Sequence, residues 1–368
     1  MNVLHLSSNI KFGGSEQQLI YLIEGLKKQN IKSFIFCYDT SMLLEYKEKF
    51  NAGFTTLPKQ KAYSRDMISA LKQVVKNESI DIIHIHNGKF VLTYMLADIL
   101  FRLPCKVVFS KKDMATRSSL FSRIKYNYKG VQKVLCVSHA VKRRFEEILL
   151  KKNHYKLQVL RDGLNFDDLK IYDDVNIHKS FDIEPHKIIV GNVANHVNAK
   201  DLSTFVLTLD YLVNNCKLTN IHFLQIGRFT GTTETLKELV KEKQLDDYIT
   251  FTDFIKDGYK YTSQCDIFLM TSINEGLPLT IMESFYYKIP VVSTIAGGIP
   301  EAITHGENGL LADLKDAETL GKHIISLCND DVLKKNIIEN AYTLVTTTFS
   351  AQKMTENTIV VYNELLGK

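Results

Sequence analysis

The stretch TSINEGLPLTIMESFYYKIPVVSTIAGGIPE (271–301) decides the fold of this chain. It follows the apolar run CDIFLM (265–270) and contains a second one, VVST (291–294), and both are short enough to be buried strands. Between them, apolar residues recur at helical spacing from Pro278, which suits a first helical turn because its missing N–H would have no partner there. Strand, helix and strand in this order predict a parallel α/β sheet.

A second helix is expected after the second strand, where Gly297-Gly298 makes a turn and Pro300 stands near the helix start. Two helix N-termini would then lie on one sheet edge, and their free N–H groups and partial positive charge suit phosphate. Glu275 and Glu283 flank the first helix eight residues apart. At about 100° per residue they lie about 80° apart, so both can face one cleft.

The segment NEGLPLTIME (274–283), followed by GGIPE (297–301) and GENGLL (306–311), resembles the E-x7-E signature of the retaining, GT-B-fold glycosyltransferases of family 4. The resemblance covers roughly the whole chain. It implies an α/β protein with the GT-B fold, in which two Rossmann-like domains face each other across a cleft. The expected parts are an acceptor-binding domain at 1–165, a linker at 166–186, a nucleotide-sugar-binding domain at 187–345, and a terminal helix at 346–368 that crosses back to the first domain.

The resemblance also implies a donor site with Glu275 as the catalytic residue. Glu275 would hold hydroxyls of the donor sugar, Glu283 would hold ribose hydroxyls, and Lys200 would hold the diphosphate. Relatives commonly have an Arg where this chain has Asn195; either activity is reduced, or Arg228 or a helix terminus compensates for the lost cation. The expected donor-binding residues are Gly13, Gly14, Asn195, Lys200, Arg228, Phe254, Ile255, Gly276, Leu277, Pro278, Leu279, Thr280 and Glu283.

The chain opens with a strand, NVLHL (2–6), a loop with Gly13-Gly14 and an amphipathic helix. A dinucleotide fingerprint would read G-x-G-x-x-G, which is missing, so binding of NAD is a poor interpretation. In the family that the chain resembles, this glycine pair faces the donor phosphates and sugar. The alternative is a plain tight turn.

Acceptor contacts are expected in the first half of the chain. In DIIHIHN (81–87), His84 and His86 share one strand face; His86 is the candidate acceptor contact and His84 is expected to be structural. A metal site would need further ligands, and none is evident. Many relatives have a donor-contacting His near the end of the next strand, where this chain has two lysines. Lys112 and Arg117 could meet an anionic acceptor there, or could simply be solvated.

Charge is distributed unevenly. The net charge is +5, but 16 Lys and Arg stand against 3 Asp and Glu between Arg102 and Arg161. The basic residues alternate with apolar and aromatic ones, which suits the surface of an anionic membrane. Nucleic acid is a rival partner for which no recognition module appears, and a solvated face is the third interpretation.

The six cysteines are scattered without zinc spacing, and they indicate a reducing cytosol. We see no signal peptide and no run of 18 apolar residues, so the expected location is cytoplasmic, with peripheral binding to the inner face of the cytoplasmic membrane.

The sequence therefore predicts an enzyme. We expect a retaining, metal-independent glycosyltransferase of the hexosyltransferase type that uses a nucleotide-diphosphate sugar as co-substrate and no cofactor. Its acceptor would be a hydroxyl of a glycan or lipid-linked glycan in surface polysaccharide or lipopolysaccharide biosynthesis. The alternatives are a nucleotide-sugar epimerase on the same fold and a non-catalytic, nucleotide-sugar-binding partner subunit.

Overall fold

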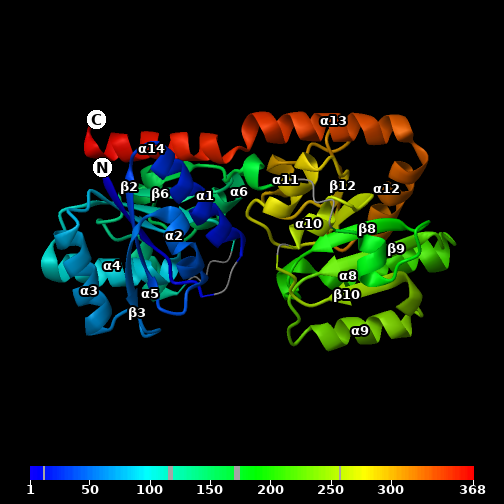
Figure 1. Ribbon diagram of the computed structural model, residues 1–368, viewed down its shortest axis with the longest axis horizontal. Helices are drawn as coiled ribbons and strands as arrows, with labels where there is room; N and C mark the ends of the chain where they lie inside the picture. The colour runs from blue at the N-terminus through cyan, green and yellow to red at the C-terminus, as the bar shows by residue number, and fades with distance from the viewer. Residues whose placement is uncertain (11–12, 115–118, 170–174, 257) are drawn as a thin grey trace. The chain divides into compact units, whose positions relative to one another are not determined.

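The computed structural model describes residues 1–368 except 11–12, 115–118, 170–174 and 257. The described chain forms two compact units (Figure 1). Unit 1 comprises Met1–Asn165 and Ser350–Lys368, and unit 2 comprises Phe166–Phe349. Each unit surrounds one parallel sheet with helices, which confirms the predicted α/β class.

Unit 1 has a seven-stranded sheet with the order β3-β2-β1-β4-β5-β6-β7. Its strands are β1 (Asn2–Leu6), β2 (Lys32–Tyr38), β3 (Gly53–Leu57), β4 (Ile82–Ile85), β5 (Lys106–Lys111), β6 (Lys133–Cys136) and β7 (Leu157–Val159). Its helices are α1 (Gly14–Lys28), α2 (Lys47–Phe50), α3 (Arg65–Asn77), α4 (Gly88–Phe101), α5 (Leu120–Tyr126), α6 (His139–Glu146) and α14 (Ala351–Leu366).

The last helix, α14, packs against α1 (Figure 1). Val361 and Tyr362 of α14 are fully buried in one cluster with Leu22 and Leu26 of α1 and Val3 of β1. The side chain of Ser350 caps this helix by accepting from the N–H of Lys353. Burial of this apolar face stabilises unit 1 with residues that follow all of unit 2 in the sequence.

Unit 2 has a six-stranded sheet with the order β10-β9-β8-β11-β12-β13. Its strands are β8 (Ile188–Val193), β9 (Ile221–Ile226), β10 (Ile249–Thr252), β11 (Ile267–Met270), β12 (Val291–Thr294) and β13 (Leu310–Ala312). Its helices are α7 (Ile177–Phe181), α8 (Leu202–Asp210), α9 (Thr233–Glu242), α10 (Tyr259–Thr262), α11 (Leu279–Tyr286), α12 (Ala317–Asn329) and α13 (Asp331–Thr348). Its main core joins Phe205 of α8, Phe223 of β9 and Ile324 of α12.

The predicted second helix after Gly297-Gly298 is wrong, because only a single 3₁₀ turn, Ile299–Glu301, forms there. The side chain of Asn308 explains the early end: its Oδ1 accepts from the N–H of Thr304 (2.7 Å), and its Nδ2 donates to the carbonyl of Ala302 (2.9 Å). These backbone groups would otherwise extend a helix. One helix N-terminus, that of α11, therefore remains next to the signature.

The stretch 166–186, expected as a polar linker, contains α7 and belongs to unit 2. Ile177 and Ile183 are buried, and the N–H of Ile177 donates to Oε1 of Gln264 (3.0 Å). The described part of this stretch is thus anchored to unit 2, because the burial of its apolar side chains there is favourable.

Candidate functional site

The carboxyl ends of β8 and β11 mark the place where the strand order of unit 2 reverses. From β8 the chain moves to β9 and β10 on one side, whereas β12 and β13 follow β11 on the other. Open parallel sheets bind ligands at such a switch point, because the two loops diverge there and leave a crevice. The loops concerned are 194–201, after β8, and 271–278, after β11.

These two loops are held together by hydrogen bonds. The hydroxyl of Thr271 contacts the carbonyl oxygens of Lys200 (3.1 Å) and Asp201 (3.0 Å). The N–H of Ile273 donates to the carbonyl of Ala199 (2.9 Å). The position of Lys200 is therefore coupled to the loop that carries the E-x7-E signature.

Glu275 lies where the two loops meet. Its Oε1 accepts from Nζ of Lys200 (2.6 Å) and from the hydroxyl of Ser272 (2.7 Å). Its side chain is 11% exposed and that of Lys200 is 25% exposed. The carboxylate is thus fixed by two donors where the loops after β8 and β11 meet, and its remaining lone pairs can accept from a ligand.

A third loop, after β12, fixes the backbone of Glu275. The N–H of Gly298 donates to the carbonyl of Glu275 (3.0 Å), and the hydroxyl of Thr294 donates to the carbonyl of Ser272 (2.5 Å). Gly297 has φ of +53°, and a Cβ on it would lie 2.1 Å from the carbonyl oxygen of Glu275. Only glycine combines this left-handed conformation with so close an approach.

Helix α11 begins at Leu279, after the extended Pro278. The N–H groups of its first turn, which include those of Leu279 and Thr280, have no partner within the helix. Gly276 and Leu277 are buried, so the expected contacts of these residues with a donor would come from the backbone. Burial also raises the pKa of Glu283, about one turn into the helix, to about 7.

Asn195, Arg228 and Phe254 come together at the carboxyl ends of β8, β9 and β10. Oδ1 of Asn195 accepts from the N–H of Arg228 (3.1 Å), and the guanidinium of Arg228 lies 5.1 Å from the centre of the Phe254 ring. Asp253 fixes the same turn by accepting from the N–H of Phe254 (2.6 Å). Because β10 ends at Thr252, Phe254 and Ile255 are in the loop after the strand. Asn195 is a neutral side chain that holds the backbone of the loop in which Arg228 lies.

In unit 1, Gly13 precedes α1 and is extended, with φ of −168°. Any residue adopts this conformation, so backbone geometry does not require a glycine at this position. Glu16 in the first turn of α1 is buried and accepts from the side chain of Asn9. Burial raises the pKa of this carboxyl, and its hydrogen bond to Asn9 offsets part of the rise.

The structure brings His86 and Lys112 together at a small pocket of about 20 Å³, which Ser110 and Asp162 also line. Nζ of Lys112 is 2.6 Å from Oδ1 of Asp162, and both side chains are mostly buried. Burial raises the pKa of Asp162, and the charge of Lys112 opposes the rise. Lys112 is therefore held by an ion pair rather than solvated. Arg117, the other expected acceptor contact, lies outside the described residues.

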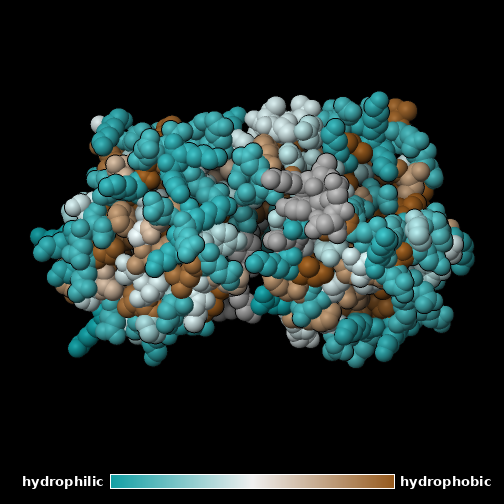
Figure 2. Space-filling model, in the orientation of Figure 1, coloured by the Kyte–Doolittle hydropathy of each residue, from teal (hydrophilic) through white to brown (hydrophobic). Residues whose placement is uncertain are grey.

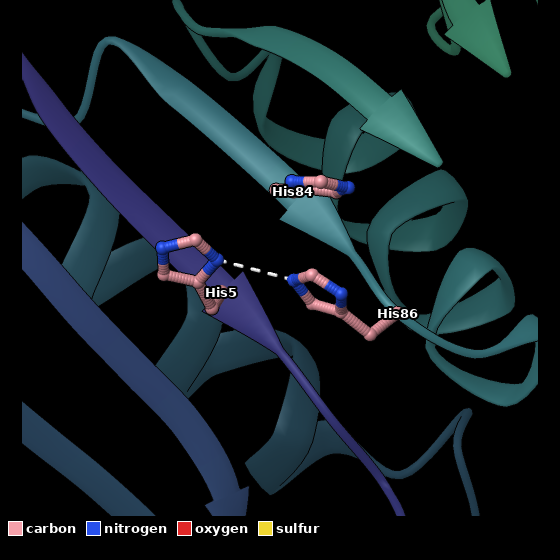
Figure 3. Close-up of side chains that lie close together, drawn as sticks. All are labelled: His5, His84 and His86. Carbon is pink, nitrogen blue, oxygen red and sulfur yellow. Dashed lines mark hydrogen bonds between the residues drawn. The ribbon is translucent and has the colours of Figure 1, made fainter. Parts of the chain in front are cut away.

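Three buried histidines, His5, His84 and His86, form a cluster (Figure 3). Nδ1 of His5 and Nε2 of His86 are 3.1 Å apart, and the rings of His84 and His86 are 4.1 Å apart. His84 contacts the hydroxyls of Tyr362 (2.6 Å) and Ser110 (2.7 Å) through its two nitrogens. Burial lowers the pKa of all three imidazoles, that of His5 to about 3.

The three histidines are also a group whose ligand nitrogens, one per residue, lie within 4.8 Å of one another. Zinc is commonly bound by such imidazoles. His84 would have to give up one of its two hydroxyl contacts to ligate a metal, and the charge of Lys112 already acts on His84 and His86. These hydrogen bonds favour the expected structural role of His84, whereas His5 is a further candidate ligand that the sequence did not indicate.

Sequence reasoning missed the residues that fix Glu275. Ser272 bonds its carboxylate, Gly297 and Gly298 accommodate its carbonyl, and Thr294 bonds the loop before it. A signal was present, since Thr271-Ser272 directly follows β11 and Thr294 ends β12. Hydroxyl residues at the carboxyl ends of parallel strands are placed to bond the loops of a switch point.

Two family models match this chain. "Glycosyl transferases group 1" matches residues 173–344, and "Glycosyltransferase Family 4" matches residues 12–158. The chain belongs to the group 1 glycosyltransferases. The predicted glycosyltransferase membership is thereby confirmed, and the retaining character stays a prediction.

Two curated relatives of this glycosyltransferase are similar over most of their length. An N-acetyl-alpha-D-glucosaminyl L-malate synthase from Bacillus anthracis is 24% identical, with 83% of this chain and 80% of the relative covered. An Escherichia coli UDP-Gal:alpha-D-GlcNAc-diphosphoundecaprenol alpha-1,3-galactosyltransferase is 20% identical, with 92% and 95% covered.

Solved structures confirm the predicted GT-B fold. The Anabaena protein Alr3699/HepE in complex with UDP has a TM-score of 0.86 at 17% identity, with 99% of this chain and 100% of that chain covered. A glycosyltransferase from Rickettsia africae has a TM-score of 0.85 at 21% identity, with 99% and 98% covered.

Proposed function

We propose that this glycosyltransferase moves a hexose from a nucleotide-diphosphate sugar to a hydroxyl of a glycan or lipid-linked glycan, with retention of configuration at the anomeric carbon. One observation carries the proposal: three loops at the switch point fix Glu275 beside Lys200 and the start of α11. A carboxylate, a cation and helix amides at one crevice fit a sugar joined to a diphosphate.

Lys200 and the first turn of α11 would hold the leaving diphosphate. The ammonium of Lys200 has three donor protons, so it can keep its bond to Glu275 and donate to a phosphate oxygen as well. Arg228 would add a second cation from the loop after β9. We propose that these groups stabilise the leaving group without a metal ion and without a cofactor.

Glu275 would accept hydrogen bonds from the donor sugar and stabilise the positive charge that develops at the anomeric carbon. The bond to the diphosphate breaks and the acceptor oxygen forms its bond on the same face, so configuration is retained. The acceptor proton passes to the leaving diphosphate. We assign donor contacts to the other expected residues of unit 2 and of the Gly13-Gly14 loop, and acceptor contacts to His86, Lys112 and Arg117.

The acceptor class and location are supported by the relatives and by charge. Relatives include O-antigen and capsular polysaccharide biosynthesis glycosyltransferases from Escherichia coli and Staphylococcus aureus. Among the described helices, none has both the length and the apolar character needed to cross a bilayer. We propose a cytoplasmic enzyme of surface polysaccharide or lipopolysaccharide synthesis whose basic stretch at 102–161 binds the anionic inner face of the membrane.

A panel of nucleotide sugars tests the donor assignment. We expect slow hydrolysis of one donor, faster turnover when membrane extract supplies acceptor, and no loss of either rate in EDTA. UDP sugars are the first choice, because solved relatives bind UDP and UDP-glucose. Binding without turnover in the presence of extract would contradict the proposal, and a rate abolished by EDTA and restored by Mg²⁺ would contradict metal independence.

Donor affinity should rise with pH if Glu283 holds the ribose. The ionised carboxylate accepts from both ribose hydroxyls, and the pKa of Glu283 is raised to about 7 by burial. The ionised fraction is then low at pH 6 and high at pH 8, so affinity should be about tenfold higher at pH 8. Calorimetry with UDP-glucose measures this. Glu283→Gln should bind weakly and without pH dependence; an unchanged slope in this variant would remove Glu283 from the role.

A further inference from the structure

Helix α5 exposes an apolar face that unit 1 leaves uncovered. Leu120, Phe121 and Ile124 are 73%, 81% and 53% exposed, and every residue of α5 keeps at least part of its surface accessible. Figure 2 shows hydrophobic side chains reaching the surface of this unit among hydrophilic ones. Single exposed apolar side chains are common on soluble proteins, but large ones that lie next to each other are not. Three of them on one short helix therefore indicate a binding surface.

The anchoring of α5 shows which way this face points. Tyr126 stacks on Phe109 of β5 (ring centres 5.5 Å apart) and contacts Phe145 of α6 (4.9 Å). At about 100° per residue, Leu120, Phe121 and Ile124 fall within an arc of about 100°. Tyr126 lies on the opposite side of the helix, so the apolar arc points away from the core of unit 1.

A second segment with the same character is joined to α5. Asn127, directly after the helix, accepts from the N–H of Leu150 (2.7 Å) and donates to the carbonyl of Ile148 (3.2 Å). Leu150 is 52% exposed and Tyr155 is 74% exposed. We call α5 together with residues 148–155 the α5 surface. Its two segments hold a fixed relation through the side chain of Asn127.

Exposed cations accompany the apolar side chains of the α5 surface. Arg123, Lys151 and Lys152 are exposed on its two segments, and the sequence around them carries 16 Lys and Arg against 3 Asp and Glu between residues 102 and 161. A protein partner could cover an apolar face without this charge. Apolar side chains beside cations match a bilayer with anionic headgroups, in which acyl chains receive the former and phosphates the latter.

We propose that the α5 surface inserts Leu120, Phe121 and Ile124 into an anionic lipid bilayer. This inference deepens the proposed function, since it names the residues that bring this glycosyltransferase to a lipid-linked acceptor. The basic side chains attract the protein to the membrane, and the apolar arc then enters the interface. Each apolar side chain that is fully buried contributes about tenfold to the partition coefficient.

Flotation of the full chain with phosphatidylcholine vesicles, with and without phosphatidylglycerol, tests the proposal. The wild type should bind the anionic vesicles and bind them less at high salt. Leu120→Ser/Phe121→Ser/Ile124→Ser should lower binding at least a hundredfold. The matched control is Leu314→Ser/Val332→Ser/Val360→Ser, which removes three exposed apolar side chains outside the α5 surface and should bind normally.

Two results would overturn the proposal. Equal vesicle binding by the triple variant and the wild type would leave only electrostatic attraction. A wild type that stays off vesicles but sediments as a dimer, with a monomeric triple variant, would assign the α5 surface to a second copy of the chain. Donor hydrolysis without vesicles, measured in parallel, should be equal in all variants; its absence throughout would count against the proposed function and not against membrane insertion.

Discussion

Replacing Glu275 by Gln should lower the rate of sugar transfer on the order of a thousandfold and leave unit 2 folded. The amide keeps the shape of the carboxylate but cannot stabilise positive charge at the anomeric carbon. It can still accept from Ser272, so the bonds between the loops should survive. Transfer of labelled sugar to membrane extract measures the rate, and thermal unfolding measures the fold.

Nucleotide binding separates this role from a general effect on the site. Glu275→Gln removes the charge that Lys200 contacts, so the ammonium is left to the diphosphate, and UDP should bind at least as tightly as to the wild type. Glu307→Gln, on an exposed loop of the same unit, is the matched control and should keep full activity. Full transfer activity in Glu275→Gln would end the catalytic assignment.

Acid should unfold unit 1 through its buried histidines. The folded pKa values of His5, His84 and His86 lie below 6.5, the value expected in the unfolded chain. The unfolded state therefore takes up protons first as pH falls, so stability is full above about pH 6.5 and is lost below it. Three such groups remove up to about 4 kcal/mol per pH unit, against a total of about 5–15 kcal/mol for a domain.

Hydrogen exchange at pH 7 and pH 5 measures this loss in β1 and β4 separately from unit 2. His86→Gln should reduce the pH dependence by about a third, because one of three titrating groups is gone. His186→Gln, at an exposed position, should leave it unchanged. If the stability of unit 1 falls equally steeply with pH in the wild type and in His86→Gln, protonation of the histidine cluster does not cause its unfolding in acid.

The sequence was sufficient for the architecture because each βα unit carries its own periodicity and turn residues. Ile267–Met270 and Val291–Thr294 are strands and Leu279–Tyr286 is a helix, as the spacing around the signature predicted. The helix expected after Gly297-Gly298 failed because Asn308, which lies beyond the local pattern, takes up the backbone groups that would extend it.

The candidate site was predictable in part. The spacing of Glu275 and Glu283 could be read directly, but the bonds of Lys200 and Ser272 to Glu275 depend on loops from two strands that meet only in the folded sheet. The placement of Lys112 could not be foreseen for the same reason, since its partner Asp162 lies 50 residues away. Ion pairs across such distances leave no local signature in a sequence.

The position of α14 has a consequence for biosynthesis. His84 in β4 bonds Tyr362 in α14 across 278 residues, and Val3 packs in the same cluster as Val361. Because α14 follows unit 2 in the sequence, it emerges from the ribosome only after all of unit 2 has emerged. Unit 1 therefore waits, with part of its apolar surface uncovered, although its first residues are made earliest. All seven strands of unit 1 are made before unit 2, but α14, which packs on β1, is made only after the continuous unit 2 from Phe166 to Phe349.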